Sequence, residues 1–275
     1  MFRGVSVHAI TWYNAGRLKE NWKPLETIFR EMKAAGYDGV EYDRRLPFEQ
    51  SSLELKRMAA DCGLAWVCQK VNPPDDVKDQ AGWDAFRQDL DTALALEVSV
   101  GTTGASKRPK TPEERAERMK RIAESMEKGA QLCREAGIAL AIHNHWRQLL
   151  ESREEIETML GLAPSLSLLF DTAHLQLCGG GLLELIGKHA ARIAHVHLKD
   201  LDTARPTVTD ERLGKPQEWP NFKEIGQGKI DFTPIFAALE KSGYRGWLSV
   251  ELDWASRDPF EAHKACREAL RGYGY

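Results

Sequence analysis

The sequence has no long apolar run, and its net charge is only −3. No stretch approaches the ~20 apolar residues that a membrane-spanning helix needs. A nearly balanced charge gives no broad attraction to nucleic acid or to anionic membranes. These absences argue against a membrane or nucleic-acid partner and direct attention to small-molecule substrates.

Cysteine is also sparse, and its pattern excludes a disulfide framework. The chain has five cysteines, an odd number, with no C-x-x-C pair and no signal-like N-terminal segment. This usage favours structural thiols in the reducing cytoplasm. The residues are Cys62, Cys68, Cys133, Cys178 and Cys266.

What is present is an alternation of short β-like runs with amphipathic helices. The length of 275 residues is close to the ~250 of one (β/α)₈ barrel, although length alone also allows two smaller domains. Because no linker-like composition shift occurs, the pattern predicts an α/β fold, a single TIM-barrel domain over 1–275, rather than an open doubly wound sheet. Strands are predicted at 3–9, 38–42, 64–69, 98–102, 138–142, 166–170, 192–198 and 247–251.

Helix boundaries are marked by capping residues. Thr111, Pro112 and Glu114 provide an N-cap, a first-turn proline and a capping-box glutamate for a long helix that runs to Ala136. Ser51 and Glu54 repeat the capping-box spacing. Further helices are predicted at 25–35 and 83–96, from Thr233 and Pro234, and from Asp258 and Pro259.

A segment at about 201–229 is rich in proline, glycine and charge. It is too long for an ordinary connection, which predicts a functional loop near the active-site mouth that closes as a lid. The alternative is a variable surface excursion or an oligomer contact. Arg205, Arg212, Lys215 and Trp219 are its candidate substrate contacts, with Arg205 as the first choice.

Four residues of ligand type follow four consecutive predicted strands. They are His143, Asp171, His197 and Glu251. In a parallel barrel the carboxyl ends of the strands meet at one mouth, and charged groups there are costly to bury unless they are paired or bound to metal. Imidazole with carboxylate suits a divalent ion, for which we predict Mn²⁺, with Zn²⁺ or Co²⁺ as alternatives. Any one of these histidines alone could be a hydrogen-bonded packing residue.

Strand alternation helps to sort the neighbouring histidines. Residues two apart face the same way, so His195 and His197 form one pair and His143 and His145 another. His197 is nearer the mouth, whereas His145 could be either a ligand or a substrate contact. His174, three residues after Asp171, is placed to reach a substrate hydroxyl. His189 and His263 fall in helices and are expected to face solvent.

Four motifs in the C-terminal half carry a family resemblance: LLFDTAHL (168–175), AHVHLKD (194–200), GQGKIDF (226–232) and GYRGWLSVELD (243–253). In this order they resemble the sugar-phosphate isomerase/epimerase superfamily of xylose-isomerase-like TIM barrels. The superfamily includes ketose 3-epimerases, hydroxypyruvate isomerases, inosose isomerases and inosose dehydratases. The resemblance implies that Asp171, His197 and Glu251 bind a metal and that His174 binds substrate.

One departure from this resemblance concerns the reaction. The epimerases usually have a glutamate at the position of His143, and the I-H-N-H stretch is more similar to inosose dehydratases. The resemblance as a whole favours an isomerase or epimerase in which Glu251, as base and ligand, moves a proton next to the carbonyl of a keto sugar or keto-cyclitol. The alternative is a lyase that eliminates water, with His174 or His145 as general acid. A non-catalytic sugar-binding barrel is disfavoured because Glu251 and Glu41 are present.

A third class, an apurinic-endonuclease-like nuclease, fits less well. Its metal cluster needs further ligands from the second and third strands, which end here in Glu41-Tyr42 and Gln69-Lys70. Glu41 completes a G-x-x-G-x-E pattern with Gly36 and Gly39, which predicts a substrate contact or a buried glutamate paired with a basic group. The expected partner is therefore a small sugar or cyclitol, with a homo-oligomer possible and no nucleic acid or membrane.

Overall fold

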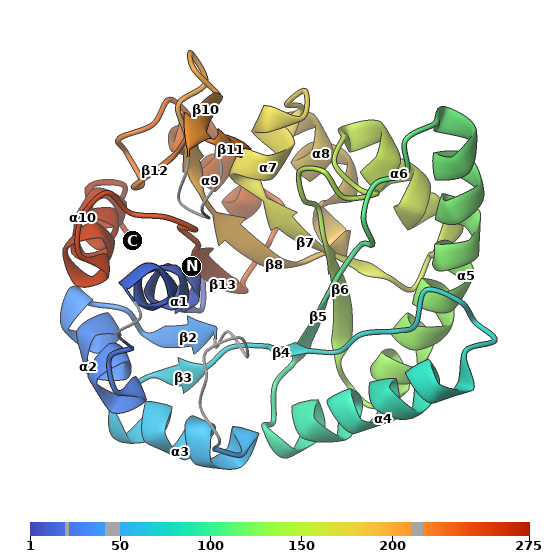
Figure 1. The fold of residues 1–275 in the computed structure, drawn as a ribbon, viewed down its shortest axis with the longest axis horizontal. Coiled ribbons are helices and arrows are strands. Elements are labelled where there is room, and N and C mark those ends of the chain that lie inside the picture. Colours follow the sequence, from blue (N-terminus) through green and yellow to red (C-terminus); the bar gives the residue numbers. More distant parts are fainter. Residues whose placement is uncertain (20–21, 42–49, 211–216) are drawn as a thin grey trace. The chain divides into compact units, whose positions relative to one another are not determined.

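The structure is a computed structural model that describes residues 1–19, 22–41, 50–210 and 217–275. Helices and parallel strands alternate along most of the chain, as the sequence predicts (Figure 1). The chain forms two compact units. Unit 1 contains residues 1–67, 197–237 and 245–275, and unit 2 contains residues 68–196 and 238–244.

In unit 1, β1 (Gly4–His8) is the central parallel strand. It pairs with β2 (Gly39–Glu41) on one side and β13 (Trp247–Val250) on the other, and β2 pairs with β3 (Ala65–Trp66). The register sets His8 opposite Glu41. The carboxyl ends of β1 and β2 therefore present polar side chains side by side.

The strand β8 (Ile193–Leu198) contributes its last two residues to unit 1. The backbone N–H of Glu251, just beyond β13, donates to the carbonyl of Leu198 over 3.1 Å. Because this bond aligns the two strand ends, Glu251 and His197 belong to the same edge of unit 1 as His8 and Glu41. Sequence positions that are far apart thus converge at that edge.

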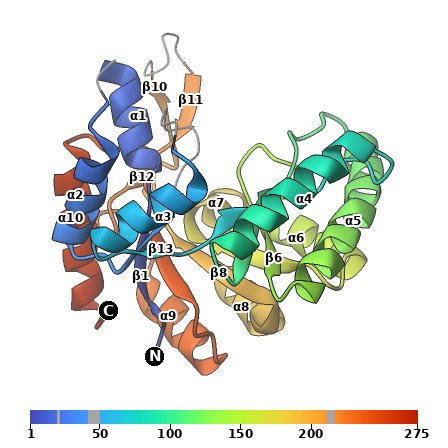
Figure 2. The ribbon, with the colours of Figure 1, turned by 90° about the horizontal axis from the view of Figure 1, so that it is seen from below.

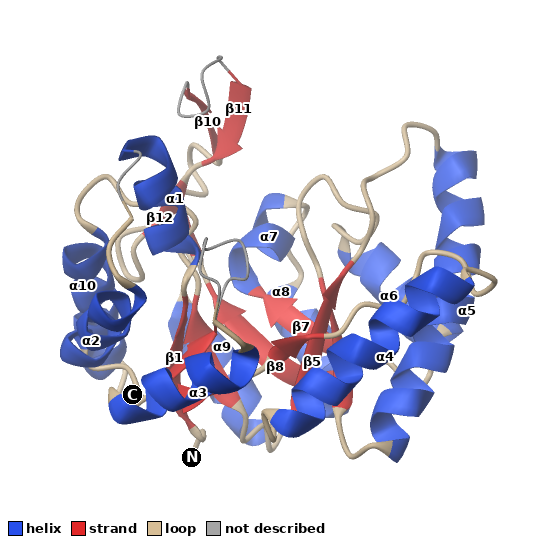
Figure 3. Cartoon of the chain, turned by 60° about the horizontal axis from the view of Figure 1, so that its bottom comes forward, coloured by secondary structure: helices blue, strands red, loops and turns tan. Residues whose placement is uncertain are grey.

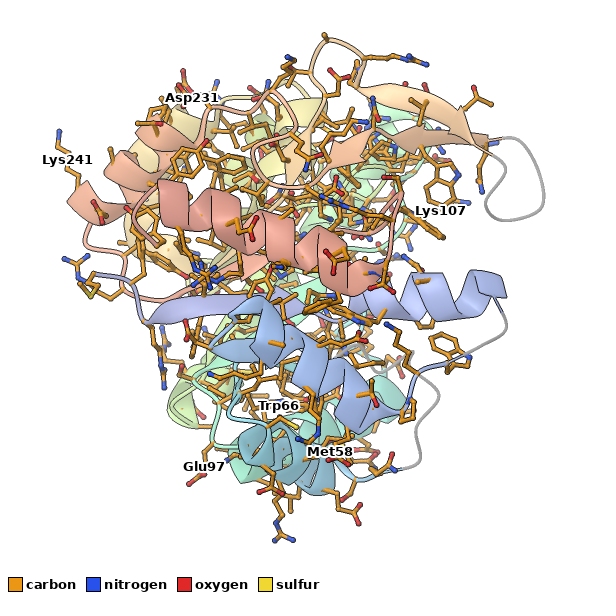
Figure 4. The ribbon with its side chains drawn as sticks, turned by 90° about the vertical axis from the view of Figure 1, so that its left-hand side faces the viewer. Met58, Trp66, Glu97, Lys107, Asp231 and Lys241 are labelled. Atoms are coloured by element: carbon orange, nitrogen blue, oxygen red, sulfur yellow. The ribbon has the colours of Figure 1, made fainter. Side chains whose placement is uncertain are left out.

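Helices cover the strands of unit 1. They are α1 (Ile10–Lys19), α2 (Leu25–Ala35), α3 (Ser52–Asp61), α10 (Pro259–Gly272) and the first residues of α9 (Phe232–Lys241). The helices α2 and α10 lie side by side, although the colours of Figure 1 mark them as coming from opposite ends of the sequence; Figure 3 shows the same pair among the helices of this unit. In Figure 4, Met58 of α3 lies near Trp66 of β3, while Lys241 extends outward from the end of α9.

Unit 2 has its own run of parallel strands. The order is β4 (Gln69–Lys70), β5 (Val100–Gly104), β6 (Ala139–His143), β7 (Ser167–Asp171) and β8. Buried aliphatic residues fill β6 and β7, and each strand ends in a buried polar residue, His143 or Asp171. The unit therefore sets an imidazole and a carboxylate on adjacent strand ends.

Capping boxes begin two helices of unit 2. Thr111 caps α5 with Glu114, as the sequence predicts, and Ser152 caps α6 with Glu155, which the sequence analysis did not single out. The helices α5 and α6 pack against each other (Figure 2). Their bounds are α4 (Gln80–Ala95), α5 (Pro112–Glu135), α6 (Arg153–Leu162), α7 (Thr172–Leu177) and α8 (Leu182–His189), followed by the 3₁₀ turn η1 (Ala190–Arg192).

The segment 201–229 differs from the predicted loop because it contains strands. An antiparallel hairpin joins β10 (Thr207–Asp210) to β11 (Gln217–Pro220), and β12 (Phe222–Lys223) pairs with β9 (Asp200–Leu201). The carboxylate of Asp200 accepts hydrogen bonds from the backbone N–H groups of Leu201, Gly226, Gly228 and Ile230. These bonds hold the end of the segment against its beginning. Arg212 and Lys215 lie outside the described residues, and a lid role remains a prediction.

Two further expectations need correction. The chain continues from β1 directly into α1, a helix that the sequence patterns did not mark. His263 does not face solvent: it is fully buried, stacks on Trp12 at 4.7 Å and contacts the hydroxyls of Thr11 (2.8 Å) and Tyr37 (3.1 Å). Burial lowers the pKa of His263 to about 3, so it remains neutral in this core. His189 is half-buried and lies 3.7 Å from the carboxylate of Glu157.

The five cysteines are free thiols, as predicted. Burial raises the pKa of Cys133, Cys178 and Cys266 to about 12, which keeps these thiols protonated and unreactive. Within the described ranges, no helix combines the length and the apolar character needed to span a membrane.

Candidate metal centre

In unit 2, the predicted ligands His143 and Asp171 lie together at the ends of β6 and β7. Nε2 of His143 is 3.4 Å from Oδ2 of Asp171. The other carboxylate oxygen, Oδ1, caps α7 by accepting the backbone N–H of His174 over 2.8 Å. Because one oxygen is held by the helix cap, Oδ2 is the oxygen that Asp171 presents toward His143.

The residue between the two histidines of the I-H-N-H stretch locks this pair in place. The side-chain oxygen of Asn144 accepts the backbone N–H of Asp171 at 2.9 Å, and its side-chain nitrogen donates to the Asp171 carbonyl at 3.2 Å. Asn144 is fully buried. It therefore ties the end of β6 to the end of β7 and fixes the two candidate ligands relative to each other.

Three imidazoles gather near these strand ends of unit 2. The ring of His174 lies 3.9 Å from that of His145 and 5.6 Å from that of His143, measured between centroids. The backbone N–H of Trp146 donates to Nδ1 of His174 over 3.4 Å, which leaves the proton of the neutral ring on Nε2. His174 can therefore donate a hydrogen bond through Nε2. His145 follows β6 rather than belonging to it, so strand alternation does not decide its direction.

In unit 1, His197 lies between two carboxylates. Nε2 is 3.0 Å from Oε2 of Glu41, and Nδ1 is 2.9 Å from Oε2 of Glu251. Burial alone would lower the pKa of His197, but the charges of Glu41 and Glu251 outweigh it and raise the pKa to about 10. His197 is therefore an imidazolium that neutralises part of the charge of these two glutamates.

Glu251 has a second cationic partner that the sequence analysis did not single out. Nζ of Lys199 lies 2.8 Å from Oε2 of Glu251, and Lys199 is 1% exposed. Burial by itself would raise the pKa of Glu251, but Lys199 and His197 hold it well below its usual range. Lys199 stands in the H-x-K-D motif, and this position two residues after a ligand was the signal that could have found it.

His8 is another residue that sequence reasoning missed. It ends β1, and its Nδ1 lies 3.8 Å from Oε1 of Glu251 while accepting the N–H of Ile10 at 3.1 Å. The rule that identified His197, a histidine at the carboxyl end of a predicted strand, also applies to His8. Its ring makes an edge contact with that of His197, with centroids 5.8 Å apart.

The donor set suits a divalent ion. All four predicted ligands are buried, two in each unit, and each offers an imidazole nitrogen or a carboxylate oxygen. Buried carboxylates and imidazoles are ligand types that suit Mn²⁺, Zn²⁺ or Co²⁺. His195 is also buried, in β8. Arg205, in contrast, is exposed in the turn before β10, so its substrate contact remains a prediction.

Comparison with known proteins decides the family. The profile described as "Xylose isomerase-like TIM barrel" matches residues 29–273. This chain belongs to that family. The predicted fold, an α/β TIM barrel, and the resemblance drawn from the C-terminal motifs are both confirmed.

Named relatives include both catabolic proteins and dehydratases. The chain is 30% identical to a rhizopine catabolism protein, MocC, of Rhizobium meliloti, and the match covers 94% of this chain and 83% of the relative. It is 29% identical to an inosose dehydratase of Geobacillus kaustophilus, over 86% of this chain and 82% of the relative. The chain is thus similar to a rhizopine catabolism protein and to inosose dehydratases along most of its length.

Solved structures agree on the fold. An L-ribulose 3-epimerase matches with a TM-score of 0.71 and 20% identity, covering 100% of this chain and 94% of the other. A structure described as IOLI protein with a binding zinc atom matches with a TM-score of 0.69 and 17% identity, over 98% and 96%. At these identities the likeness extends to the fold alone.

Proposed function

We propose that the protein is a metal-dependent isomerase or epimerase that acts on a keto sugar or keto-cyclitol. The observation that carries the proposal is Glu251, a buried carboxylate at a strand end of a family barrel, beside an imidazole and fixed by a buried lysine. A carboxylate so placed can take a proton next to a carbonyl and return it to the neighbouring carbon.

His143, Asp171, His197 and Glu251 would together hold one divalent ion, with Mn²⁺ as the first expectation and Zn²⁺ or Co²⁺ as alternatives. Support comes from the family barrel, in which strand ends share one mouth, and from the buried histidine–carboxylate pair in each unit. The zinc in the similar IOLI structure adds to this support. The bound ion would polarise the carbonyl and stabilise negative charge on its oxygen.

Metal content tests the ligand set directly. Wild-type protein purified with added Mn²⁺ and then desalted should retain about one ion per chain, whereas His197→Ala should retain less than about a tenth of that amount, because losing one of four ligands weakens a chelate strongly. Elemental analysis measures both. His189→Ala is the matched control, since His189 is half-buried on α8 and should leave the content unchanged. Equal metal content in wild type and His197→Ala would reject the assignment.

Other residues have supporting roles in the proposal. His174, with its Nε2 proton, would donate to a substrate hydroxyl or to a departing oxygen. His145, whose Nδ1 lies 2.7 Å from the Trp146 carbonyl, would contact substrate from the same side. Glu41 pairs with His197, which supports the interpretation that it is a buried glutamate paired with a basic group. A contact between Glu41 and the substrate is a proposal.

An alternative reaction is elimination of water from a keto-cyclitol. Epimerisation by removal from one face and return to the other normally needs two bases, and here His143 stands where the epimerases usually have the second carboxylate. A metal-bound imidazole has its lone pair committed to the ion and cannot also accept a proton. The likeness to inosose dehydratases favours this lyase, in which Glu251 removes the proton and the imidazolium form of His174 or His145 protonates the leaving hydroxyl and is left neutral.

The products in deuterium oxide separate the two reactions. An isomerase incubated with ketoses and keto-inositols should give saturated products with deuterium at the exchanged carbon, detected by NMR. A lyase should instead give an unsaturated ketone with ultraviolet absorbance. Formation of that chromophore from a keto-inositol would replace the isomerase proposal with the lyase, and absence of turnover with either substrate class by metal-loaded protein would reject both.

A further inference from the structure

Lys199 is a buried lysine beside a proposed catalytic carboxylate. Lysine is seldom fully buried unless it is paired. Here 1% of the residue is exposed, and Nζ lies 2.8 Å from Oε2 of Glu251 and 3.3 Å from Oδ2 of Asp253. The ammonium also lies over the ring of Phe222, 4.7 Å from its centroid. A cation held on several sides has one well-defined position.

The surroundings of Lys199 are themselves anchored. Phe222 belongs to β12, which pairs with β9 immediately after Lys199. The backbone carbonyl of Asp253 accepts a hydrogen bond from the side chain of Asn14 over 2.7 Å, which ties the residues after β13 to α1. The ring and the carboxylate that flank the ammonium therefore belong to segments that are themselves held by strand pairing or by a hydrogen bond.

The two oxygens of Glu251 have different environments. Oε2 is contacted by both Lys199, at 2.8 Å, and Nδ1 of His197, at 2.9 Å. Oε1 faces a more distant imidazole: Nδ1 of His8 lies 3.8 Å from it and already accepts the N–H of Ile10. Two close cationic contacts thus hold Oε2, whereas Oε1 is available to face the substrate.

We infer that Lys199 is a positioning residue that holds Oε2 of Glu251, so that Oε1 is the oxygen directed to the reacting proton. The inference rests on the proposed function of Glu251. Without the ammonium, the carboxylate can rotate about its terminal bond and exchange its two oxygens. Catalysis then falls because a base must lie within hydrogen-bond reach of its proton in a defined direction.

This role predicts an unusual separation of metal binding from turnover. Removing Lys199 takes a positive charge away from a cation site, so divalent-metal affinity should be maintained or increased. Loss of orientation should nevertheless lower kcat by roughly 10- to 100-fold, as for other residues that orient metal ligands. KM should change by less than about threefold, because Lys199 is buried behind Glu251 and would not contact the substrate. A residue that served only the fold would lower metal affinity, kcat and protein yield together.

The experiment compares Lys199→Met and Lys199→Gln with Lys23→Met. Lys23 is a matched control because its ammonium also joins two carboxylates, Glu31 at 2.6 Å and Asp258 at 3.2 Å, in unit 1. Metal affinity is measured by competition with a chromophoric chelator, kcat and KM with the substrate found for the wild type, and the direction of the Glu251 carboxylate by crystallography. We expect retained metal, reduced kcat and a rotated carboxylate in either Lys199 variant that folds, and none of these changes in Lys23→Met.

The outcomes separate this inference from the proposed function. A Lys199 variant with wild-type kcat, or with the Glu251 carboxylate in its original direction, overturns the positioning role while active wild-type protein still supports the reaction. Inactive, metal-free wild-type protein overturns the proposed function. In that case the carboxylate direction in the Lys199 variants still decides whether the lysine orients Glu251.

Discussion

Replacing Glu251 by glutamine is expected to lower kcat/KM by about 1,000-fold or more. General-base catalysis alone contributes about 100- to 10,000-fold, and both the isomerase and the lyase reactions use Glu251 as the base. Glutamine has nearly the same shape, so the loss reflects the missing charge rather than a cavity. The variant also leaves Lys199 and the protonated His197 facing an uncharged amide, which should reduce the metal content and the melting temperature.

The measurement is steady-state kinetics on metal-loaded protein, with elemental analysis of the same samples. Glu31→Gln is a suitable control because Glu31 is also a partly buried glutamate of unit 1, paired with Lys23 and with the indole of Trp12. It should lose stability without losing turnover per bound ion. A Glu251→Gln protein with full activity would contradict both reactions.

The parts of the fold that depend on local signals could be predicted from the sequence. The capping box at Thr111 and Glu114 and the first-turn proline set the start of α5 at Pro112, where the structure has it. The helix predicted at 25–35 corresponds to α2 without a shift, since Gly36 adopts a φ of 101° that favours glycine and ends the helix. In such places the residues that determine the structure are close together in the chain.

Elements stabilised by distant contacts could not be predicted in this way. The helix α1 buries polar as well as apolar side chains: the hydroxyl of Thr11 donates to the carbonyl of Leu252, and Asn14 donates to that of Asp253. Because polar side chains are buried together with apolar ones, the sequence of α1 shows no clear amphipathic pattern, and the partners that hold it lie about 240 positions away. The predicted strand 64–69 likewise divides into β3 and β4, because its two ends pair with different neighbours, β2 and β5.

The site shows the same distinction. Strand ends were predictable because apolar runs stop at them, and this placed His143, Asp171, His197 and Glu251 at the carboxyl ends of strands or directly after them. The pairings of His197 with Glu41 and of Glu251 with Lys199 depend on strand neighbours that only the fold defines. His263 was misjudged because its polarity was given more weight than its helical spacing from the buried residues Pro259, Cys266 and Leu270.

Metal affinity should increase steeply with pH, and the reason is the proton on His197. The carboxylates of Glu41 and Glu251 raise the pKa of His197 to about 10, so the metal-free protein binds this proton throughout the neutral range. A divalent ion needs the neutral imidazole and must displace the proton. Affinity should therefore fall about tenfold for each pH unit below 10, which amounts to about 100-fold between pH 8.5 and pH 6.5.

The same raised pKa should make the metal-free protein less stable as the pH rises, whereas its metal affinity increases. Because the pKa of His197 lies above the ordinary 6.5, its contribution to stability is fully present below pH 6.5 and is lost as the pH rises through about 10. Bound metal should remove this dependence by replacing the proton. Thermal melts of metal-free and metal-loaded protein at pH 6.5 and pH 9.5 would show the difference.

Chelator competition across pH 6.5 to 8.5, with a pH indicator to count released protons, measures the affinity effect. At least one proton per ion should be released throughout this range. Glu41→Gln provides the decisive comparison: removing one of the two carboxylates that hold the proton lowers the pKa of His197, so the pH dependence of metal affinity should become shallower at the alkaline end while His197 remains available as a ligand. A wild-type affinity that is constant from pH 6.5 to 8.5 would show that the ion does not displace the His197 proton, and His197 would then no longer qualify as a ligand.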